Sequence, residues 1–197
     1  MKSNLILRIH HVLFSSRANG PGKRAVIWLQ GCSFRCPGCF NPVLQNPAGG
    51  YEMSISTLAE NLIARKTEIE GITVSGGEPV EQIEPLIKLF SIIKKKTHFS
   101  VLLFSGHTLK KIQSMDNGAK LLSLVDVLVD GPYDKNLANP IGTWPSSANQ
   151  NIILLTWRYS KTDFHEIPWR DIFIGPSGDI IETGLFGWPG RVPDLSF

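Results

Sequence analysis

Short runs of β-branched and aromatic residues recur along the chain and alternate with stretches whose apolar residues fall three or four positions apart. Each run stops abruptly at glycine or at polar residues, which is typical of a buried strand that ends in a loop. The runs predict strands at residues 25–29, 71–74, 100–104, 125–129 and 151–155.

The stretches between these runs carry helix signals. Ser54 is a good capping residue for a helix that we expect to end near Lys66. Apolar residues at helical spacing predict a second helix over residues 83–93. Thr108 is placed to cap a third helix after the strand at 100–104. The chain therefore repeats a unit of strand, loop and helix.

Strands that alternate with helices form parallel sheets with right-handed crossovers. A closed eight-unit barrel takes about 250 residues, and this chain has 197. The sequence therefore predicts the α/β class, as an open, partial β/α barrel of five to six parallel strands. We expect one domain over residues 1–197, with a core at about 5–155 and a C-terminal extension at about 156–197.

Two segments do not fit the repeating unit. Residues 130–150 are irregular and rich in Pro, Asn and Ser, and connections of this length in compact domains are usually functional or disordered. In the extension, residues 171–174 and 179–181 flank a Gly-Pro-Ser-Gly turn at 175–178. This pattern predicts a C-terminal β-hairpin appended to the barrel.

Composition narrows the functional classes. Apolar residues make up 42% of the chain and charged residues 19%, which is enough to build a core. The net charge is +3, and the one dense basic run, at 94–96, lies at a predicted helix end without interleaved aromatic residues, so nucleic acid is disfavoured as a direct ligand. No signal peptide pattern is found, and no apolar run approaches the roughly 20 residues of a membrane helix. We expect a cytoplasmic protein with no membrane partner.

The three cysteines, Cys32, Cys36 and Cys39, lie within eight residues in the spacing CxxxCxxC. Three thiolates on one tight loop can each take a corner of a 4Fe-4S cluster and leave the fourth iron open, whereas structural zinc and tetrathiolate iron-sulfur sites need a fourth ligand. The alternatives are a zinc site completed by a histidine such as His10 or His11, and reactive surface thiols.

A second motif follows the next predicted strand, as Ser75-Gly76-Gly77-Glu78-Pro79. Two glycines let the backbone approach a ligand closely, and Glu78 can accept a hydrogen bond from an ammonium group. Taken alone, this segment is only a turn. Because the carboxyl ends of parallel strands meet at one edge of a sheet, we expect this loop and the cysteines to form one composite site.

Together these motifs resemble the radical S-adenosylmethionine superfamily, in which CxxxCxxC and GGEP occur in this order. Within it, residues 5–155 are similar to the activating proteins of anaerobic ribonucleotide reductase. The resemblance is carried by NGPGKR at 19–24, QGCSFRCPGCFNP at 30–42, FSGHT at 104–108, VDVLVDGP at 125–132 and SANQ at 147–150.

The resemblance implies a 4Fe-4S cluster held by the three cysteines and S-adenosyl-L-methionine bound to its open iron, with Gly76, Gly77 and Glu78 at the methionine end. One electron, from a donor such as flavodoxin or ferredoxin, would break the sulfonium bond. The 5'-deoxyadenosyl radical would then take a hydrogen atom from a backbone glycine of a large glycyl-radical enzyme, with anaerobic ribonucleotide reductase as the leading partner.

Further cofactor contacts are predicted from their places at strand ends and in the long loop. The candidates are Ser75, Ser105, Asp130, Asn149 and Gln150. Each has a purely structural alternative, because serine before glycine turns a chain, aspartate before Gly-Pro stops a strand, and asparagine caps a loop. His107 is interpreted as a packing residue, and Trp28 and Phe34 are expected to pack around the cluster.

Two other functions are weighed against glycyl-radical activation. A radical enzyme that acts directly on a peptide or a small molecule is disfavoured because three cysteines cannot build an auxiliary cluster. A non-enzymatic metal-binding or electron-transfer module would leave the GGEP loop without a role. The extension after Thr156, with Trp157, Trp169 and Trp188, departs from the family pattern and leaves the target open. Its hairpin is expected to extend a rim on which a protein partner docks.

Overall fold

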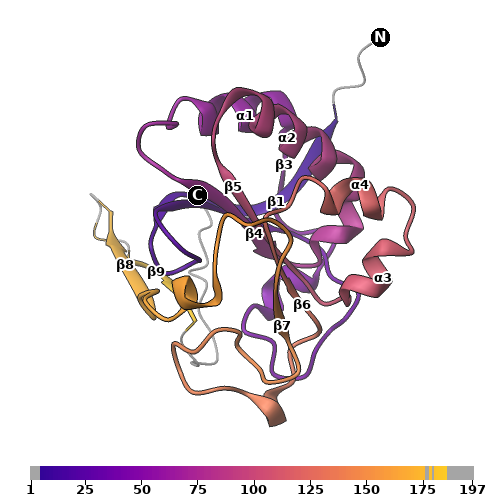
Figure 1. The fold of residues 1–197 in the computed structure, drawn as a ribbon, viewed down its shortest axis with the longest axis vertical. Coiled ribbons are helices and arrows are strands. Elements are labelled where there is room, and N and C mark those ends of the chain that lie inside the picture. Colours follow the sequence, from indigo (N-terminus) through magenta and orange to yellow (C-terminus); the bar gives the residue numbers. More distant parts are fainter. Residues whose placement is uncertain (1–4, 176–177, 179, 186–197) are drawn as a thin grey trace.

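The computed structural model describes residues 5–175, 178 and 180–185, which form a mixed sheet with helices on one face and a C-terminal hairpin (Figure 1). Seven strands form the sheet in the order β3-β1-β2-β4-β5-β6-β7. The α/β class predicted from the alternating pattern is therefore confirmed.

Four neighbouring strands at the centre of the sheet run parallel, namely β2 (Arg24–Leu29), β4 (Gly71–Gly76), β5 (Ser100–Ser105) and β6 (Val127–Asp130). All of β2 and β6 is buried, and so is nearly all of β4 and β5. Parallel strands that are covered on both faces are continuous apolar runs in the sequence. For this reason the sequence predicted the ends of these four strands to within two residues.

Of the predicted five to six parallel strands, these four pair in parallel, and each of the remaining three strands pairs antiparallel with its neighbours in the sheet. They are β1 (Ile6–Ser16), β3 (Tyr51–Ser54) and β7 (Asn151–Leu154). No α-helix lies in the described connection from β6 to β7, and β7 returns beside β6 in the opposite direction. β1 and β3 are only partly buried and lack a continuous apolar run, and the sequence pattern did not reveal them.

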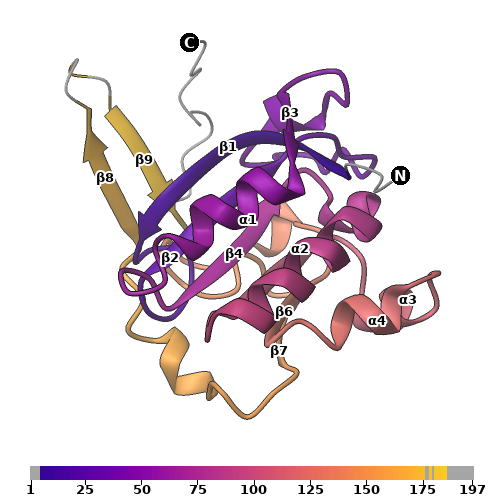
Figure 2. The same cartoon turned by 90° about the horizontal axis from the view of Figure 1, so that it is seen from above.

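Helices cover one face of the sheet (Figure 2). They are α1 (Ile55–Ile63), α2 (Ile83–Lys96), α3 (Leu109–Gln113) and α4 (Gly118–Leu122). Ser54 and Thr108 cap α1 and α3 as predicted, with Ser54 Oγ accepting from the Thr57 amide at 3.1 Å. α1 ends at Ile63, three residues before the predicted end near Lys66. No helix in the described ranges is long and apolar enough to cross a membrane.

The main core lies between these helices and alternate residues of the sheet, such as Ile27, Val74 and Leu103. The other set of strand residues faces away from the helices. There Leu102, Val127 and Val129 form a second cluster with Phe164 and Ile167 of the extension. The extension therefore shares a hydrophobic cluster with the sheet.

Arg24 closes the amino-terminal end of this second face. Its side chain is fully buried, and burial lowers the pKa of its guanidinium. The guanidinium donates to Thr73 Oγ1 at 2.8 Å, to the Ile72 carbonyl at 2.6 Å and to Tyr159 Oη at 3.2 Å. A buried cation requires such partners, and Tyr159 ties the start of the extension to the base of the sheet.

The predicted C-terminal hairpin is present, as β8 (Arg170–Ile174) paired antiparallel with β9 (Ile180–Gly184). Of the predicted hairpin, residues 176 and 177 of the turn and residue 179 of the second strand lie outside the described part of the chain. The long connection over 130–150 is irregular as expected, apart from a 3-10 turn at Lys135–Leu137 and a bridge between Ala138 and Ser147.

Candidate active site

A cavity of about 210 Å³ opens at the carboxyl ends of the parallel strands. Its lining comes from the cluster loop after β2, the GGEP loop after β4, residues 104–106 at the end of β5 and the connection after β6. Residues 181–185 of β9 and its continuation supply a further side. The two sequence motifs therefore meet at the sheet edge where they were expected.

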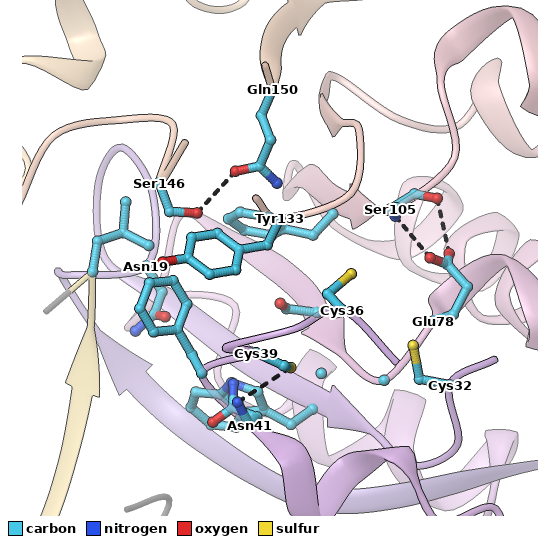
Figure 3. Close-up of a pocket in the computed structure, with 18 of the residues that line it drawn as sticks. Asn19, Cys32, Cys36, Cys39, Asn41, Glu78, Ser105, Tyr133, Ser146 and Gln150 are labelled. Atoms are coloured by element: carbon cyan, nitrogen blue, oxygen red, sulfur yellow. Dashed lines mark hydrogen bonds between the residues drawn. The ribbon is translucent and has the colours of Figure 1, made fainter. Parts of the chain in front are cut away.

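The three cysteines line this cavity on one loop (Figure 3). Backbone bonds hold the loop at both ends, from the Gly31 amide to the Leu44 carbonyl at 2.8 Å and from the Cys39 amide to the Cys36 carbonyl at 3.1 Å. All three thiols are free and partly buried. Burial raises the pKa of the Cys32 and Cys36 thiols.

Zinc and a 4Fe-4S cluster make different demands on the cysteine sulfurs. Tetrahedral zinc with Zn–S bonds near 2.3 Å draws its sulfurs to within about 4 Å of one another. Among the described residues, no three His, Cys, Asp or Glu side chains gather around a point where one metal ion would sit. A 4Fe-4S cluster instead takes each cysteine at a separate iron. Three cysteines that line one cavity are the ligand set that such a cluster takes.

The two histidines suggested as zinc ligands make contacts with residues outside the cysteine loop. His10 Nδ1 lies 3.2 Å from Gln30 Oε1, and His11 stacks on Trp28 with ring centroids 5.9 Å apart. Burial and the neighbouring His10 lower the pKa of His11. His11 lines the cavity, but the described structure gathers it into no metal-holding group with the cysteines.

The GGEP loop is joined directly to the start of the cluster loop. The Gly77 amide donates to the Leu29 carbonyl and the Glu78 amide to the Gly31 carbonyl, both at 2.8 Å. A Cβ on Gly77 would lie 1.9 Å from the Gly31 oxygen, and one on Gly76 would lie 2.4 Å from the Leu29 nitrogen. The glycines thus allow two backbones to touch, a role that sequence reasoning had given to contact with the ligand.

Glu78 is 1% exposed and its carboxylate already has partners within the chain. Oε1 accepts from the Ser105 hydroxyl at 2.8 Å and the Val80 amide at 3.0 Å, and Oε2 accepts from the Gly106 amide at 2.7 Å. Burial raises the pKa of Glu78, and these hydrogen bonds oppose the rise. The carboxylate therefore fastens the end of β5 to the GGEP loop.

This arrangement predicts that Glu78→Gln costs stability. Glutamine would present an NH2 group to donors that now face a carboxylate, and leaving such buried donors unpaired costs about 1–3 kcal/mol. Urea unfolding of metal-free protein measures the loss, with Glu84→Gln, at an exposed position in the first turn of α2, as the control. Equal stability of the two variants would contradict the structural role of Glu78.

The other predicted site residues divide into two groups. Ser75, Ser105 and Gln150 line the cavity. Asp130 and Asn149 do not belong to the lining: Asp130 accepts from the Leu109 amide at 2.6 Å and the Asn151 side chain at 2.9 Å, and Asn149 donates to the Pro132 carbonyl at 2.7 Å. The structure thus places these two among loop-fixing contacts.

Trp28 and Phe34, which were predicted to pack around the cluster, both line the cavity. Phe34 packs edge-on against His107 with ring centroids 4.7 Å apart. Sequence reasoning missed several lining residues, including Asn19, Phe40, Tyr133 and Trp144. Tyr133 lies three residues after the end of β6, which was a usable signal, and its ring centroid is 4.5 Å from that of Phe40. The lining residues of β9 carried no signal in the sequence.

Comparison with known proteins agrees with this site. Residues 18–153 match the family described as a 4Fe-4S single cluster domain. The anaerobic ribonucleoside-triphosphate reductase-activating protein of Enterobacteria phage T4 is 33% identical over 151 residues, which cover 74% of this chain and 88% of that protein. The protein of the same name from Vibrio cholerae serotype O1 is 32% identical over 141 residues, covering 68% of this chain and 89% of the relative.

The pyruvate formate-lyase-activating enzyme of Clostridium pasteurianum is 38% identical over 104 residues, which cover 51% of this chain and 44% of that enzyme. The family match and the similarity to the phage and Vibrio proteins each span more than two thirds of the chain. The chain therefore belongs to the 4Fe-4S single cluster domain family and is a radical S-adenosylmethionine enzyme of the glycyl-radical activating class, with a 4Fe-4S cluster and S-adenosyl-L-methionine as its cofactors.

Proposed function

We propose that this enzyme cleaves S-adenosylmethionine reductively and forms a glycyl radical on anaerobic ribonucleoside-triphosphate reductase. The observation that carries the proposal is the direct backbone contact between the cluster loop and the GGEP loop at the mouth of one cavity. That contact fixes the sites for the cluster and for the methionine end of the cofactor relative to each other. The names of the phage and Vibrio relatives support this partner.

In this proposal Cys32, Cys36 and Cys39 ligate three irons of the cluster, which when bound supplies the electron that breaks the sulfonium bond. The Asn41 amide donates to Cys39 Sγ at 3.4 Å, and hydrogen bonds to ligating sulfurs influence the reduction potential of such clusters. Phe34 contacts Gly106, whose added Cβ would meet the ring at 2.8 Å, so this aromatic side chain shields the loop from water.

The methionine end of the cofactor is proposed to lie against Ser75, Gly76 and Gly77, whose carbonyls can accept from its ammonium group. Ser105 and Glu78 position this loop through their mutual hydrogen bond at 2.8 Å. Asp130 and Asn149 are proposed to act one step further away, by fixing the start of α3 and the chain after β6.

The finer architecture belongs to the same proposal. We interpret the open sheet as a partial β/α barrel whose face opposite the helices surrounds the cofactors, within a single domain that includes the extension. The electron donor is proposed to be a flavodoxin or a ferredoxin, and the cytoplasm the compartment where the reaction runs. Pyruvate formate-lyase is a second candidate partner, favoured by the similarity to the Clostridium enzyme.

The test is an anaerobic assay with reconstituted enzyme, dithionite, S-adenosylmethionine and purified anaerobic ribonucleotide reductase. We expect 5'-deoxyadenosine, methionine and an electron paramagnetic resonance doublet of a glycyl radical on the reductase. A reductase in which the radical glycine is replaced by alanine is the control. A glycyl-radical signal on pyruvate formate-lyase alone would show that pyruvate formate-lyase is the partner. Cofactor cleavage without a radical on either protein would reject glycyl-radical formation on both.

A further inference from the structure

The C-terminal hairpin forms one side of the active-site cavity. Residues 181–185, which comprise most of β9 and Leu185, belong to the cavity lining together with the cluster loop and the GGEP loop. Figure 1 shows the hairpin on the side of the sheet away from helices α1 to α4. The hairpin is thus part of the active site as well as a peripheral appendage of the sheet.

One carboxylate attaches the hairpin to the end of β1. Asp171 Oδ2 accepts three hydrogen bonds, from the Ser16 hydroxyl at 2.6 Å, the Arg17 amide at 2.6 Å and the Ala18 amide at 3.1 Å. Hydrogen bonds to a charged acceptor are stronger than neutral ones. Ser16 is 1% exposed and Asp171 is half-buried, so the anchor is partly shielded from water.

Two further contacts hold β9 across the cavity. Asn19, in the loop between β1 and β2, donates from Nδ2 to Thr183 Oγ1 of β9 at 2.9 Å. Gly142, in the connection between β6 and β7, donates its amide to the carbonyl of Leu185, which directly follows β9, at 2.8 Å. These loops lie toward opposite ends of the strand order. β9 therefore bridges the two sides of the open sheet.

We propose that the hairpin is a wall that keeps external hydrogen donors away from the 5'-deoxyadenosyl radical, and that Asp171 is the residue that positions it. Such a radical takes a hydrogen atom from any donor within reach: the donor C–H bond breaks, a C–H bond forms at C5', and the unpaired electron passes to the donor. With the wall in place, hydrogen donors are excluded from the side of the cavity that residues 181–185 line, and the substrate's glycine has to enter past the other lining segments.

The consequence can be measured without a partner. Reconstituted enzyme is reduced with dithionite and given S-adenosylmethionine in buffer with perdeuterated glycerol, and deuterium in the 5'-deoxyadenosine product is quantified by mass spectrometry. We expect Asp171→Ala to raise the deuterated fraction several-fold over the native enzyme. Asp171→Asn, whose amide oxygen can still accept, should restore most of the shielding. Ile174→Ser, on the hairpin at a position 74% exposed, should match the native enzyme.

A structural readout accompanies this measurement. Amide hydrogen exchange of β9 should accelerate in Asp171→Ala and not in Ile174→Ser. Should Asp171→Ala fold poorly, Thr183→Val removes only the bond to Asn19 and should raise deuterium transfer to a smaller degree. Faster exchange of β9 with unchanged deuterium transfer would overturn the proposal, as would equal transfer in Ile174→Ser and Asp171→Ala.

A further measurement, made with the partner enzyme present, rests on the proposed function. With anaerobic ribonucleotide reductase present, Asp171→Ala should form fewer glycyl radicals for each S-adenosylmethionine cleaved, because external donors intercept the radical. If the native enzyme forms no glycyl radical on any tested partner but Asp171→Ala still admits the deuterated donor, the proposed partner is wrong and the wall stands. Normal coupling in Asp171→Ala would count against the wall whatever the partner.

Discussion

Replacement of Cys36 by alanine is expected to abolish binding of the 4Fe-4S cluster and, with it, all cleavage of S-adenosylmethionine. The chain has three cysteines, so no other thiol can take the place of the lost ligand. Reconstituted native protein should contain about four irons and four sulfides per chain, and the variant close to none. Iron and sulfide analysis and the visible absorbance of the cluster check this, and Cys32→Ala and Cys39→Ala should behave alike.

The control for the cysteine variants is Val43→Ala, because Val43 follows the cluster loop and is 53% exposed. It should keep the native iron content and activity. Secondary structure of the cysteine variants, measured without metal, should equal that of metal-free native protein, since the thiols make no disulfide. Stoichiometric zinc in protein never exposed to air, with no iron-dependent absorbance, would refute the cluster assignment.

Replacement of Gly77 by alanine is expected to disrupt both the fold of the site and its activity. The new methyl group would lie 1.9 Å from the carbonyl oxygen of Gly31, which is backbone and cannot swing aside. Overpacking of this kind lowers the free energy of unfolding by up to about 3 kcal/mol. In a domain of this size, that loss lowers the melting temperature by about 10 °C. Displacement of the GGEP loop by about 1 Å should reduce cofactor cleavage about 100-fold.

Gly178→Ala provides the matched control for the Gly77 variant. Gly178, unlike Gly77, has a positive φ, of +86°, and among the described residues nothing lies within 4 Å of its added Cβ. This variant therefore carries only the backbone strain of the left-handed region, about 1–2 kcal/mol, and no collision. Calorimetry and the assay for 5'-deoxyadenosine separate the two effects. A Gly77→Ala enzyme with native stability and native cofactor cleavage would show that the two loops are free to move apart.

The sequence alone determined the features that depend on neighbours in the chain. The four central strands were located because each is a continuous apolar run, and Ser54 and Thr108 capped the helices that they precede. The three cysteines, which lie within eight residues, indicated an iron-sulfur cluster with an open iron, and together with the GGEP segment they carried the resemblance that implied S-adenosylmethionine. Both motifs were placed at one sheet edge by the rule that parallel strands end together.

The tertiary structure decided which groups those residues meet. Gly77 approaches Gly31 across 46 residues of chain, and the Glu78 carboxylate is occupied by Ser105 and Gly106, so residues assigned to a ligand also hold two loops together. The direction of β1, β3 and β7 likewise depends on pairing with distant strands. The hairpin reached the cavity through Asp171 and Ser16, which are 155 residues apart. Hydrogen bonds between residues so far apart leave no periodic trace in the sequence, because each depends on where the whole sheet brings its ends.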